Sequence, residues 1–349
     1  MYGISLITGD GVGPELADSG VAILDTISDC TDVKFDITQL VAGDTALKDM
    51  GTALPADTLD NIKKSDACLK APVGESAADV IVHLRRVLDL YANIRPARSY
   101  PGVACLREDI DMVIVRENTE DLYTGMEFQI DDAAIALRII SKSASHRIAK
   151  KAFEMAKQRD MMKKVTCVHK SNVMRVSDGL FRRTCDEVAK QYADVILEHM
   201  YVDACAMNLI RQPEQFDVIL TTNLFGDILS DESSQVVGGL GIAPAANIGD
   251  NFALFEPVHG AAFDIAGRNM VNPVSFILSI RMMLEWLGMT KSDTRCIRIA
   301  NILEGVIADT IQSGNVTHDL GGNQGTKEFT NVIVNTFKDY YPSDVTDVT

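Results

Sequence analysis

Residues 2–27 read YGISLITGDGVGPELADSGVAILDTI, and their hydrophobic pattern changes at a glycine-rich turn. The apolar run before the turn is typical of a buried strand, whereas residues 15–27 carry apolar side chains at helical spacing. Further strands are predicted at 33–40 and 66–72, and a helix is predicted to begin in 56–65 between them. This alternation favours an α/β fold, in which a largely parallel sheet is covered by helices.

The turn GDGVGPE at 9–15 does not match a dinucleotide-binding fingerprint. Its glycines follow the spacing G-x-G-x-G, and Pro14 stands where the fingerprint opens its helix. Asp10 would also place a carboxylate where a pyrophosphate must approach. We therefore interpret this stretch as a tight strand-to-helix turn and do not expect a Rossmann fold.

The rest of the chain continues the alternation. DVIVHLRRVLDLYANIRP predicts one helix over 79–96 that ends at Pro96. Strands are expected at 111–118, 166–173, 195–203, 217–223 and 250–257, and helices after Asn223 and near 274–288 and 293–311. Because 349 residues exceed the size at which one core keeps growing, we expect two domains.

Composition excludes several classes of protein. A formal net charge of −16 is unfavourable for nucleic-acid or acidic-membrane binding, since both need a basic surface. The longest apolar stretch, at 274–289, is interrupted by Arg281 and Glu285 and is too short to span a membrane. Seven cysteines without a C-x-x-C pair, and the lack of a signal peptide, indicate a cytoplasmic protein with reduced thiols.

Three arginines are candidates for binding an anionic substrate. Arg85 and Arg95 lie ten residues apart in the predicted helix, and Arg116 ends the apolar strand DMVIV. Arginine is suited to a bidentate grip on carboxylates, although a surface ion pair is the simpler interpretation of any one of them. Lys170 also follows a strand-like run, and a buried lysine can act as a base.

Three aspartates suggest a metal site. Asp227 and Asp231 stand four residues apart in TTNLFGDILSD, so a helix would place both carboxylates on one face. Asp203 stands at the end of another apolar run. Carboxylate oxygens suit a hard divalent cation such as Mg²⁺ or Mn²⁺, and such a cation would neutralise the neighbouring charges.

Four stretches in this order resemble the β-decarboxylating dehydrogenase family, which includes isocitrate, homoisocitrate and isopropylmalate dehydrogenases. They are LDLYANIRP (88–96), VIVRENTE (113–120), TTNLFGDILSD (221–231) and FEPVHGAAFDIAG (255–267). The resemblance implies two α/β domains, 1–92 plus 239–349 and 93–238, with the site in the cleft between them. It also implies a homodimer in which the partner completes each site.

The resemblance assigns roles to the candidate residues. Arg85, Arg95 and Arg116 would hold the malate carboxylates common to the family's substrates. Lys170 would remove the C2 hydroxyl proton, and Tyr123 would protonate the enolate after CO₂ leaves. The remaining role, binding Mg²⁺ or Mn²⁺ beside the substrate, would fall to Asp203, Asp227 and Asp231, with one or more of them supplied by the partner.

The resemblance places the cofactor on the loop 259–272. Asp264 followed by Ile265 matches members that use NAD, because an acid there accepts from the ribose 2′-hydroxyl and repels a 2′-phosphate. This chain departs from the family's usual H-G-S-A-P-D, since it has Ala261 in place of the serine and Phe263 in place of the proline. The implied cofactor residues are His259, Gly260, Ala261, Ala262, Asp264, Ile265 and Asn272.

The residues one turn before Arg85 bear on the substrate. Ile81 and Val82 are apolar, as the resemblance implies for an isopropyl substituent, so 3-isopropylmalate is the favoured substrate. Lys70 and Arg86 resemble residues of isocitrate and homoisocitrate members and keep tricarboxylates open. A catalytically silent regulatory subunit is a further alternative, although Tyr123, Lys170 and the three aspartates are all present.

Overall fold

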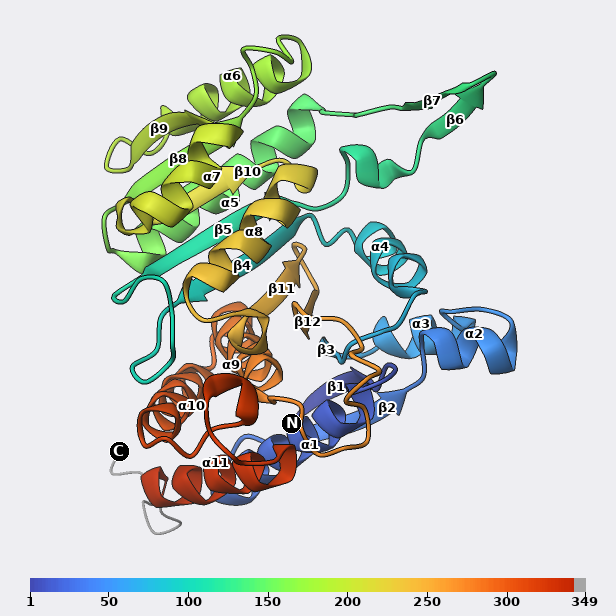
Figure 1. Cartoon of the computed structure of the whole chain (residues 1–349), viewed down its shortest axis with the longest axis vertical. Helices are drawn as coiled ribbons and strands as arrows, with labels where there is room; N and C mark the ends of the chain where they lie inside the picture. Colours follow the sequence, from blue (N-terminus) through green and yellow to red (C-terminus); the bar gives the residue numbers. More distant parts are fainter. Residues whose placement is uncertain (342–349) are drawn as a thin grey trace.

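The computed structural model describes residues 1–341, and ten strands there form one mixed sheet that runs the length of the molecule (Figure 1). The strand order is β2-β1-β3-β12-β11-β4-β5-β10-β8-β9. The strands at both ends of this order pair in parallel, whereas β11 and β4 in the middle pair antiparallel with both of their neighbours. The expected α/β fold with a mixed sheet, distinct from the Rossmann fold, is confirmed.

The first part of the chain builds one end of this sheet. Its elements are β1 (Tyr2–Ile7), α1 (Gly13–Cys30), β2 (Phe35–Leu40), α2 (Asp44–Met50), α3 (Ala56–Ile62), β3 (Ala67–Lys70), α4 (Ala77–Val87) and β4 (Ala92–Arg98). The middle part builds the other end with β5 (Asp111–Glu117), η1 (Leu122–Thr124), β6 (Glu127–Ile130), β7 (Ala133–Ala136), α5 (Lys142–Arg159), β8 (Lys164–His169), α6 (Ser177–Ala189), β9 (Ile196–Tyr201), α7 (Val202–Arg211), η2 (Pro213–Gln215), β10 (Val218–Thr221) and α8 (Asn223–Val236).

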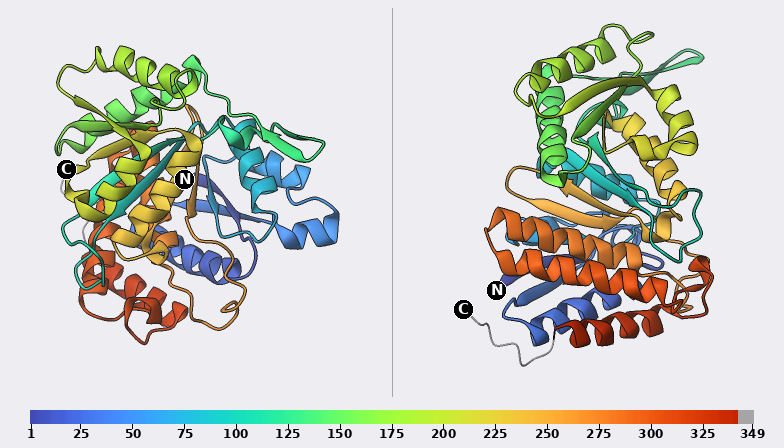
Figure 2. Two further views of the ribbon diagram at one scale, coloured as in Figure 1. Left: turned by 45° about the horizontal axis from the view of Figure 1, so that its top comes forward. Right: turned by 90° about the vertical axis from the view of Figure 1, so that its left-hand side faces the viewer.

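The last part of the chain adds strands β11 and β12 next to those of the first part. Its elements are η3 (Leu240–Ile242), β11 (Pro244–Ile248), β12 (Ala253–Pro257), α9 (Val274–Thr290), α10 (Thr294–Gln312), η4 (His318–Leu320) and α11 (Thr326–Tyr340). Figure 2 shows α9 and α10 side by side and α11 beside α1. The predicted domain boundary falls between the neighbouring strands β4 and β11, and the division itself stays a prediction.

Helices cover both faces of the sheet. On one face, α5 packs against β5 and α9 packs against β11 and β12, and this larger core includes Ile94 of β4 and Val113 of β5. On the other face, α7 and α8 pack against Met112 and Ile114 of β5 in a separate core. Because side chains alternate along a strand, Arg95 and Arg116 share the α8 face with this second core. No helix in the described residues is long and apolar enough to cross a bilayer.

The predicted helix over 79–96 is wrong in its second half. Helix α4 ends at Val87, and Arg95 lies in strand β4. Pro96 is tolerated there because no neighbouring strand needs a hydrogen bond from its backbone nitrogen. Strand β11 pairs only with residues 92–94 of β4. On the β5 side, Val113 lies opposite Pro96 but donates its N–H to the carbonyl of Asp217. The sequence reasoning also missed β11 and the β6–β7 hairpin, and it placed Asp203 on a strand although it lies in the first turn of α7.

The turn at 9–13 is a tight strand-to-helix turn, as predicted. Gly11 has φ +60°, and a Cβ there would lie 2.0 Å from the carbonyl oxygen of Ala261. The buried Asp10 carboxylate accepts hydrogen bonds from the backbone N–H groups of Asp44, Thr45 and Gly74. Asp10 therefore ties three loops together, and this use differs from ligand binding.

Candidate active site

Arg95 and Arg116, both buried, form a charged cluster with the aspartates of helix α8 on the α8 face of the sheet. Arg116 is 1% exposed and donates from Nε and Nη2 to Asn223 Oδ1 at 2.9 and 2.7 Å, and from Nη1 to Asp227. Arg95 donates to Asp231 Oδ1 at 3.0 Å, and its Nη2 lies 3.4 Å from Asp227 Oδ1. The two guanidinium groups therefore share Asp227 between them.

This arrangement explains how Asp227 and Asp231 tolerate each other. Burial alone would raise the pKa of Asp227, but the charges of Arg116 and Arg95 outweigh it and hold that pKa below its usual value. The pKa of Asp231 is raised, because burial and the neighbouring Asp227 outweigh Arg95. The negative charge of Asp231 is therefore not fully compensated by Arg95, and a further cation could bind it. The Asp231 side chain is 55% exposed, so such a cation could reach it.

Tyr123 joins the same cluster from the short helix η1. Its hydroxyl donates to Asp227, and the guanidinium carbon of Arg116 lies 5.0 Å from its ring centroid. Burial raises the pKa of Tyr123, and the Asp227 carboxylate adds to the effect. The phenol therefore keeps its proton at neutral pH, and the raised pKa makes it a weaker acid than a free tyrosine.

Arg85 reaches the cluster from α4 through a buried polar network that the sequence reasoning missed. Asn247 Oδ1 accepts from Arg85 Nε at 2.9 Å, from Asn93 and from Asn118, while its amide donates to Glu256 Oε1 at 2.8 Å. Glu256 also pairs with Lys70 at 2.8 Å and with Arg85 at 3.6 Å. A glutamate that closes the apolar run ALFEP is the one local signal that could have indicated this network.

Replacing Glu256 with glutamine is expected to lower the free energy of unfolding by about 3–5 kcal/mol, because Lys70 and Arg85 would be left with uncompensated buried charge. Burial would raise the pKa of Glu256, but Lys70 and Arg85 lower it from 4.5 to about 2. The carboxylate therefore stabilises the fold above pH 4.5 and loses that effect as the pH falls towards 2. Thermal unfolding of wild type and Glu256→Gln should show a difference in Tm that becomes smaller as the pH is lowered through this range. A difference in Tm that does not change with pH would contradict the role given to the Glu256 carboxylate.

Lys170 and Asp203 form a second, separate group. Lys170 follows β8 and donates from Nζ to Asp203, whose side chain is 65% exposed. Within residues 1–341 no hydrogen bond or ion pair joins this group to Arg95, Arg116 or Asp227, and no three His, Cys, Asp or Glu side chains there are grouped to hold a metal. One chain thus supplies Asp227 and Asp231 together and presents Asp203 elsewhere on an exposed side chain.

The predicted cofactor loop, 259–272, is held by the first turn of the chain. Val12 donates to Ala261 O at 2.8 Å, and the Glu15 carboxylate accepts from the N–H groups of Gly267 and Asn269 at 2.8 and 2.9 Å. Asn272 is buried and donates to Asp319 at 2.9 Å, so it anchors the end of the loop. Gly260, just before the first anchor, is exposed, as are Ala262 and Asp264 between the anchors, while Ile265 is half-buried.

Two further loop residues carry observations of their own. His259 is half-buried, its Nε2 has no partner within the described residues, and burial lowers its pKa, so the ring is neutral at pH 7. Ala262 has φ +39°, a conformation that L-residues adopt rarely. The Phe263 side chain, which stands where the family has proline, is 60% exposed. The loop is thus tied down at its base and open to a ligand along its middle.

Ile81 and Val82 lie on α4 and are both half-buried. Val82 and Arg85 are three residues apart, so a helix places them on the same face. Lys70 is 4% exposed and paired with Glu256, which leaves it unavailable to a substrate in this structure. Arg86 donates to Thr124 O at 3.3 Å, beside Tyr123.

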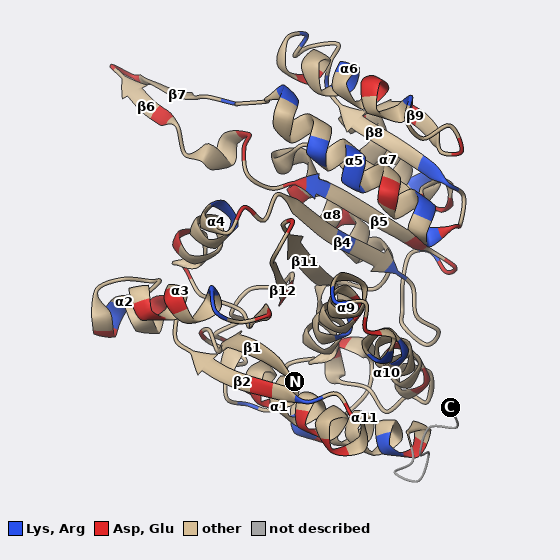
Figure 3. Ribbon diagram, turned by 180° about the vertical axis from the view of Figure 1, so that it is seen from behind, with Lys and Arg blue, Asp and Glu red and all other residues tan. Residues whose placement is uncertain are grey.

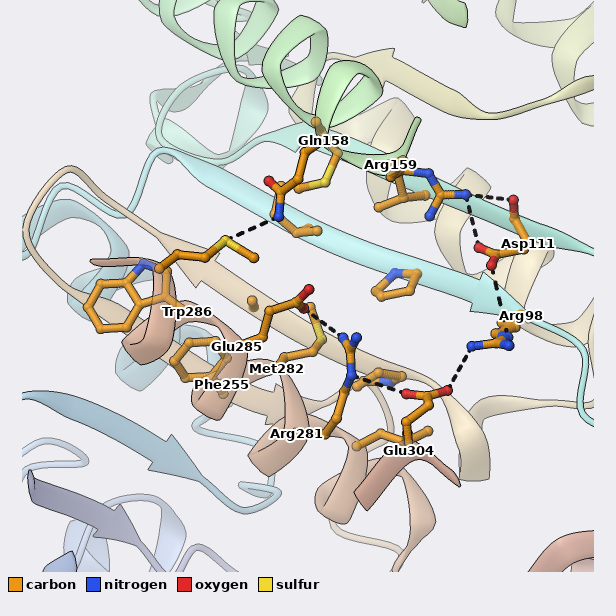
Figure 4. A pocket seen from close by; sticks show the side chains of 18 of the residues that line it. Arg98, Asp111, Gln158, Arg159, Phe255, Arg281, Met282, Glu285, Trp286 and Glu304 are labelled. Carbon is orange, nitrogen blue, oxygen red and sulfur yellow. Dashed lines mark hydrogen bonds and ion pairs between the residues drawn. The ribbon is translucent and has the colours of Figure 1, made fainter. Parts of the chain in front are cut away.

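A cavity of about 320 Å³ lies on the opposite face of the sheet (Figure 4). It is enclosed by α5, α9 and α10, with Trp286, Phe255 and Met282 among its apolar side chains and Arg98, Arg281 and Glu304 in an ion-paired rim. None of the predicted site residues lines it. The cavity is therefore distinct from the cluster around Asp227.

Arg95 and Arg116, both buried beside Asp227, form a charged cluster that suits an anionic substrate. The model of the isocitrate/isopropylmalate dehydrogenase family matches residues 3–333. A 3-isopropylmalate dehydrogenase of Sulfurisphaera tokodaii is 51% identical over 336 residues, which cover 96% of this chain and 98% of that protein. The chain belongs to the isocitrate/isopropylmalate dehydrogenase family and is an oxidatively decarboxylating dehydrogenase.

More distant relatives agree with this assignment. A homoisocitrate dehydrogenase of Methanocaldococcus jannaschii is 42% identical over 353 residues, covering 96% of this chain and 97% of that protein. The crystal structure of isocitrate dehydrogenase from Methylococcus capsulatus superposes with a TM-score of 0.89 at 39% identity, covering 97% of this chain and all of that one. The expected family is confirmed.

Proposed function

We propose that this chain oxidises and decarboxylates 3-isopropylmalate in the cytoplasm, with NAD as hydride acceptor and Mg²⁺ or Mn²⁺ as the divalent cation. The observation that carries the choice of substrate is the apolar pair Ile81 and Val82 beside Arg85 on α4. An isopropyl group would contact them without desolvating a charge, whereas Lys70, one of the two cations that could meet a third carboxylate, is already paired with Glu256. Four relatives named 3-isopropylmalate dehydrogenase are 48–51% identical, which supports the same choice.

In this proposal, residues of this chain and of an identical partner hold the substrate and move its protons. Arg85, Arg95 and Arg116 would bind the two malate carboxylates and orient the C2–H bond towards the nicotinamide. Lys170 would take the C2 hydroxyl proton, and Tyr123 would return a proton to C3 after CO₂ leaves. A cation held by Asp203, Asp227 and Asp231 would supply Lewis acidity at the C2 oxygen when bound.

The choice of NAD rests on Asp264. Its carboxylate is exposed in the middle of the anchored loop 259–272, where it could accept from a ribose 2′-hydroxyl and would repel a 2′-phosphate. His259, Gly260 and Ala261 would contact the adenosine on the same loop. The half-buried Ile265 would support the loop from beneath.

A substrate panel tests the proposal. Purified protein should turn over 3-isopropylmalate with NAD at least about tenfold more efficiently than isocitrate or homoisocitrate, since an apolar pocket that meets an extra carboxylate loses at least 1.4 kcal/mol. Initial rates with each acid under NAD and under NADP would measure this. A tenfold preference for a tricarboxylate would overturn the substrate, and a preference for NADP would overturn the cofactor. Full activity of the protein expressed alone would exclude a silent regulatory subunit.

We further propose a homodimer in which the partner supplies Lys170 and Asp203 to each site. The β6–β7 hairpin extends away from the body and is largely uncharged apart from Glu127 and an acidic tip (Figure 3). Phe128 and Ile130 of this hairpin are 48% and 52% exposed, which favours a partner surface over solvent. Such a surface would bring Asp203 of one chain to Asp227 of another.

Mixing two inactive variants tests the shared site. Asp203→Asn and Asp227→Asn proteins, refolded together, should recover about a quarter of wild-type activity, because half the dimers are mixed and each mixed dimer holds one intact site. Refolding each variant alone is the control and should restore nothing. If the mixture also stays inactive while mixed dimers form, the two aspartates act within one chain.

A further inference from the structure

Arg138 leaves the β6–β7 hairpin and turns its guanidinium into the protein, where it meets three separate segments. Nε and Nη2 donate to the two carboxylate oxygens of Asp121 at 2.6 and 3.2 Å. Nη2 also donates to Thr222 Oγ1 at 2.7 Å, and Nη1 pairs with Asp178. The guanidinium carbon lies 4.7 Å from the centroid of the Phe225 ring, so the group is also stacked.

Asp121 connects Arg138 with the segment that holds Tyr123. The Asp121 side chain is fully buried, and its Oδ1 accepts from the N–H of Leu122, which begins η1. Its Oδ2 accepts from the N–H of Leu224 in the first turn of α8 at 3.2 Å. One carboxylate thus fixes both the turn that presents Tyr123 and the start of the helix that presents Asp227.

Asp178 connects Arg138 with the backbone of Lys170. Its side chain is also fully buried, and Oδ2 accepts from the backbone N–H of Lys170 at 2.6 Å. Lys170 is the first residue after β8, and its carbonyl accepts from the N–H groups of Val173 and Met174, whereas its own N–H is bound by Asp178. The Asp178 carboxylate holds the point from which the lysine side chain extends.

We propose that Arg138 is a positioning residue that sets the geometry of both proton-transfer groups, Tyr123 and Lys170; this inference rests on the roles proposed for them above. A planar guanidinium with fixed N–H directions can serve two carboxylates and a hydroxyl at once. A lysine ammonium can supply the charge but lacks this fork. Both aspartates are fully buried and depend on Arg138 as their cation, so their orientation follows from it.

Arg159 offers a matched control. It also binds a fully buried aspartate, Asp217, from Nε at 2.8 Å, and it bonds Asp111 at 2.9 Å. It lies on the opposite face of the sheet beside the cavity and contacts neither Tyr123 nor Lys170 (Figure 4). Arg159→Ala therefore reproduces the loss of a buried ion pair without the loss of positioning.

The test compares Arg138→Ala and Arg159→Ala as full-length, folded protein with the malate that wild type uses best. Arg138→Ala should lower kcat about 30- to 300-fold with KM within about threefold, because misplaced proton-transfer groups slow chemistry more than binding. Millimolar guanidinium should restore kcat at least about fivefold in Arg138→Ala by refilling the vacated fork, and should leave Arg159→Ala unchanged. Arg138→Lys should stay about tenfold below wild type.

Several outcomes overturn the inference. A folded Arg138→Ala with kcat close to wild type does so and leaves the proposed function standing. Equal losses in both alanine variants, or no rescue by guanidinium, indicate a purely structural ion pair. If Arg138→Ala does not fold, Arg138→Lys decides, and near wild-type kcat in that variant overturns the inference. A wild type inactive on every malate removes the proposed function and this inference together.

Discussion

Lys170→Met is expected to lower kcat about 10²- to 10⁴-fold while leaving the fold intact. The loss follows from the proposed role of Lys170 as the base that removes the C2 hydroxyl proton. In the described residues, Lys170 is the one basic side chain that pairs with Asp203, a proposed ligand of the metal beside the substrate. The ion pair between Lys170 and Asp203 is largely exposed, at 27% and 65% of the two side chains, so its removal should change stability by less than about 1 kcal/mol. Steady-state rates and thermal unfolding of the same preparation would measure both effects.

Lys164→Met is the matched control for this variant. Lys164 begins the strand that Lys170 follows, and it pairs with Glu198 at 3.1 Å. The Lys164→Met variant therefore loses a comparable ion pair at the far end of β8, and its kcat should equal that of wild type. If Lys170→Met keeps a kcat within about threefold of wild type, another group removes the C2 proton.

Asp227→Asn should have the second largest effect and should change both activity and stability. The carboxylate is shared by Arg95, Arg116 and Tyr123, and it is one of the proposed metal ligands. We expect kcat/KM to fall about 10³-fold or more, and the Mn²⁺ concentration for half-maximal rate to rise at least tenfold. The free energy of unfolding should fall by about 1–3 kcal/mol, below the range for fully buried pairs because the Asp227 side chain is 38% exposed.

Glu232→Gln separates this effect from a general loss of charge on α8. Glu232 lies on the same helix and is half-buried, and no ion pair within 1–341 involves it. Its Mn²⁺ dependence should match wild type. An Asp227→Asn protein with unchanged Mn²⁺ dependence and a reduced rate would show that the carboxylate serves the arginines and not a metal.

Local sequence patterns predicted the part of the site that lies on single elements. The four-residue spacing of Asp227 and Asp231 places both on one face of α8, and Arg116 does follow the apolar run of β5, one residue before that strand ends. The physical explanation was incomplete, however, because only a metal was expected to compensate the aspartates, and Arg95 and Arg116 already pair with them within one chain. The arginines come from strands more than 100 residues earlier, and a local pattern does not show such pairs.

The errors have the same cause. Residues 79–96 have a helical hydrophobic period throughout, and only pairing with β5 and β11 makes the second half a strand. Asn247 and Glu256 are single polar residues in apolar runs, and their role appears only when Arg85 and Lys70 are brought beside them. Tertiary pairing overrides local preference at these positions.

The interleaved sheet has a consequence for synthesis of the chain on the ribosome. Strand β3 pairs with β12, and β4 pairs with β11, although about 150 to 190 residues separate the partners. Until residues 244–257 emerge, β3 and β4 of the nascent chain each have an edge of unpaired backbone N–H and C=O groups that no later strand has covered. The finished enzyme is one continuous sheet, but its growing chain passes through a long interval in which those edges are open to chaperones or to other nascent chains.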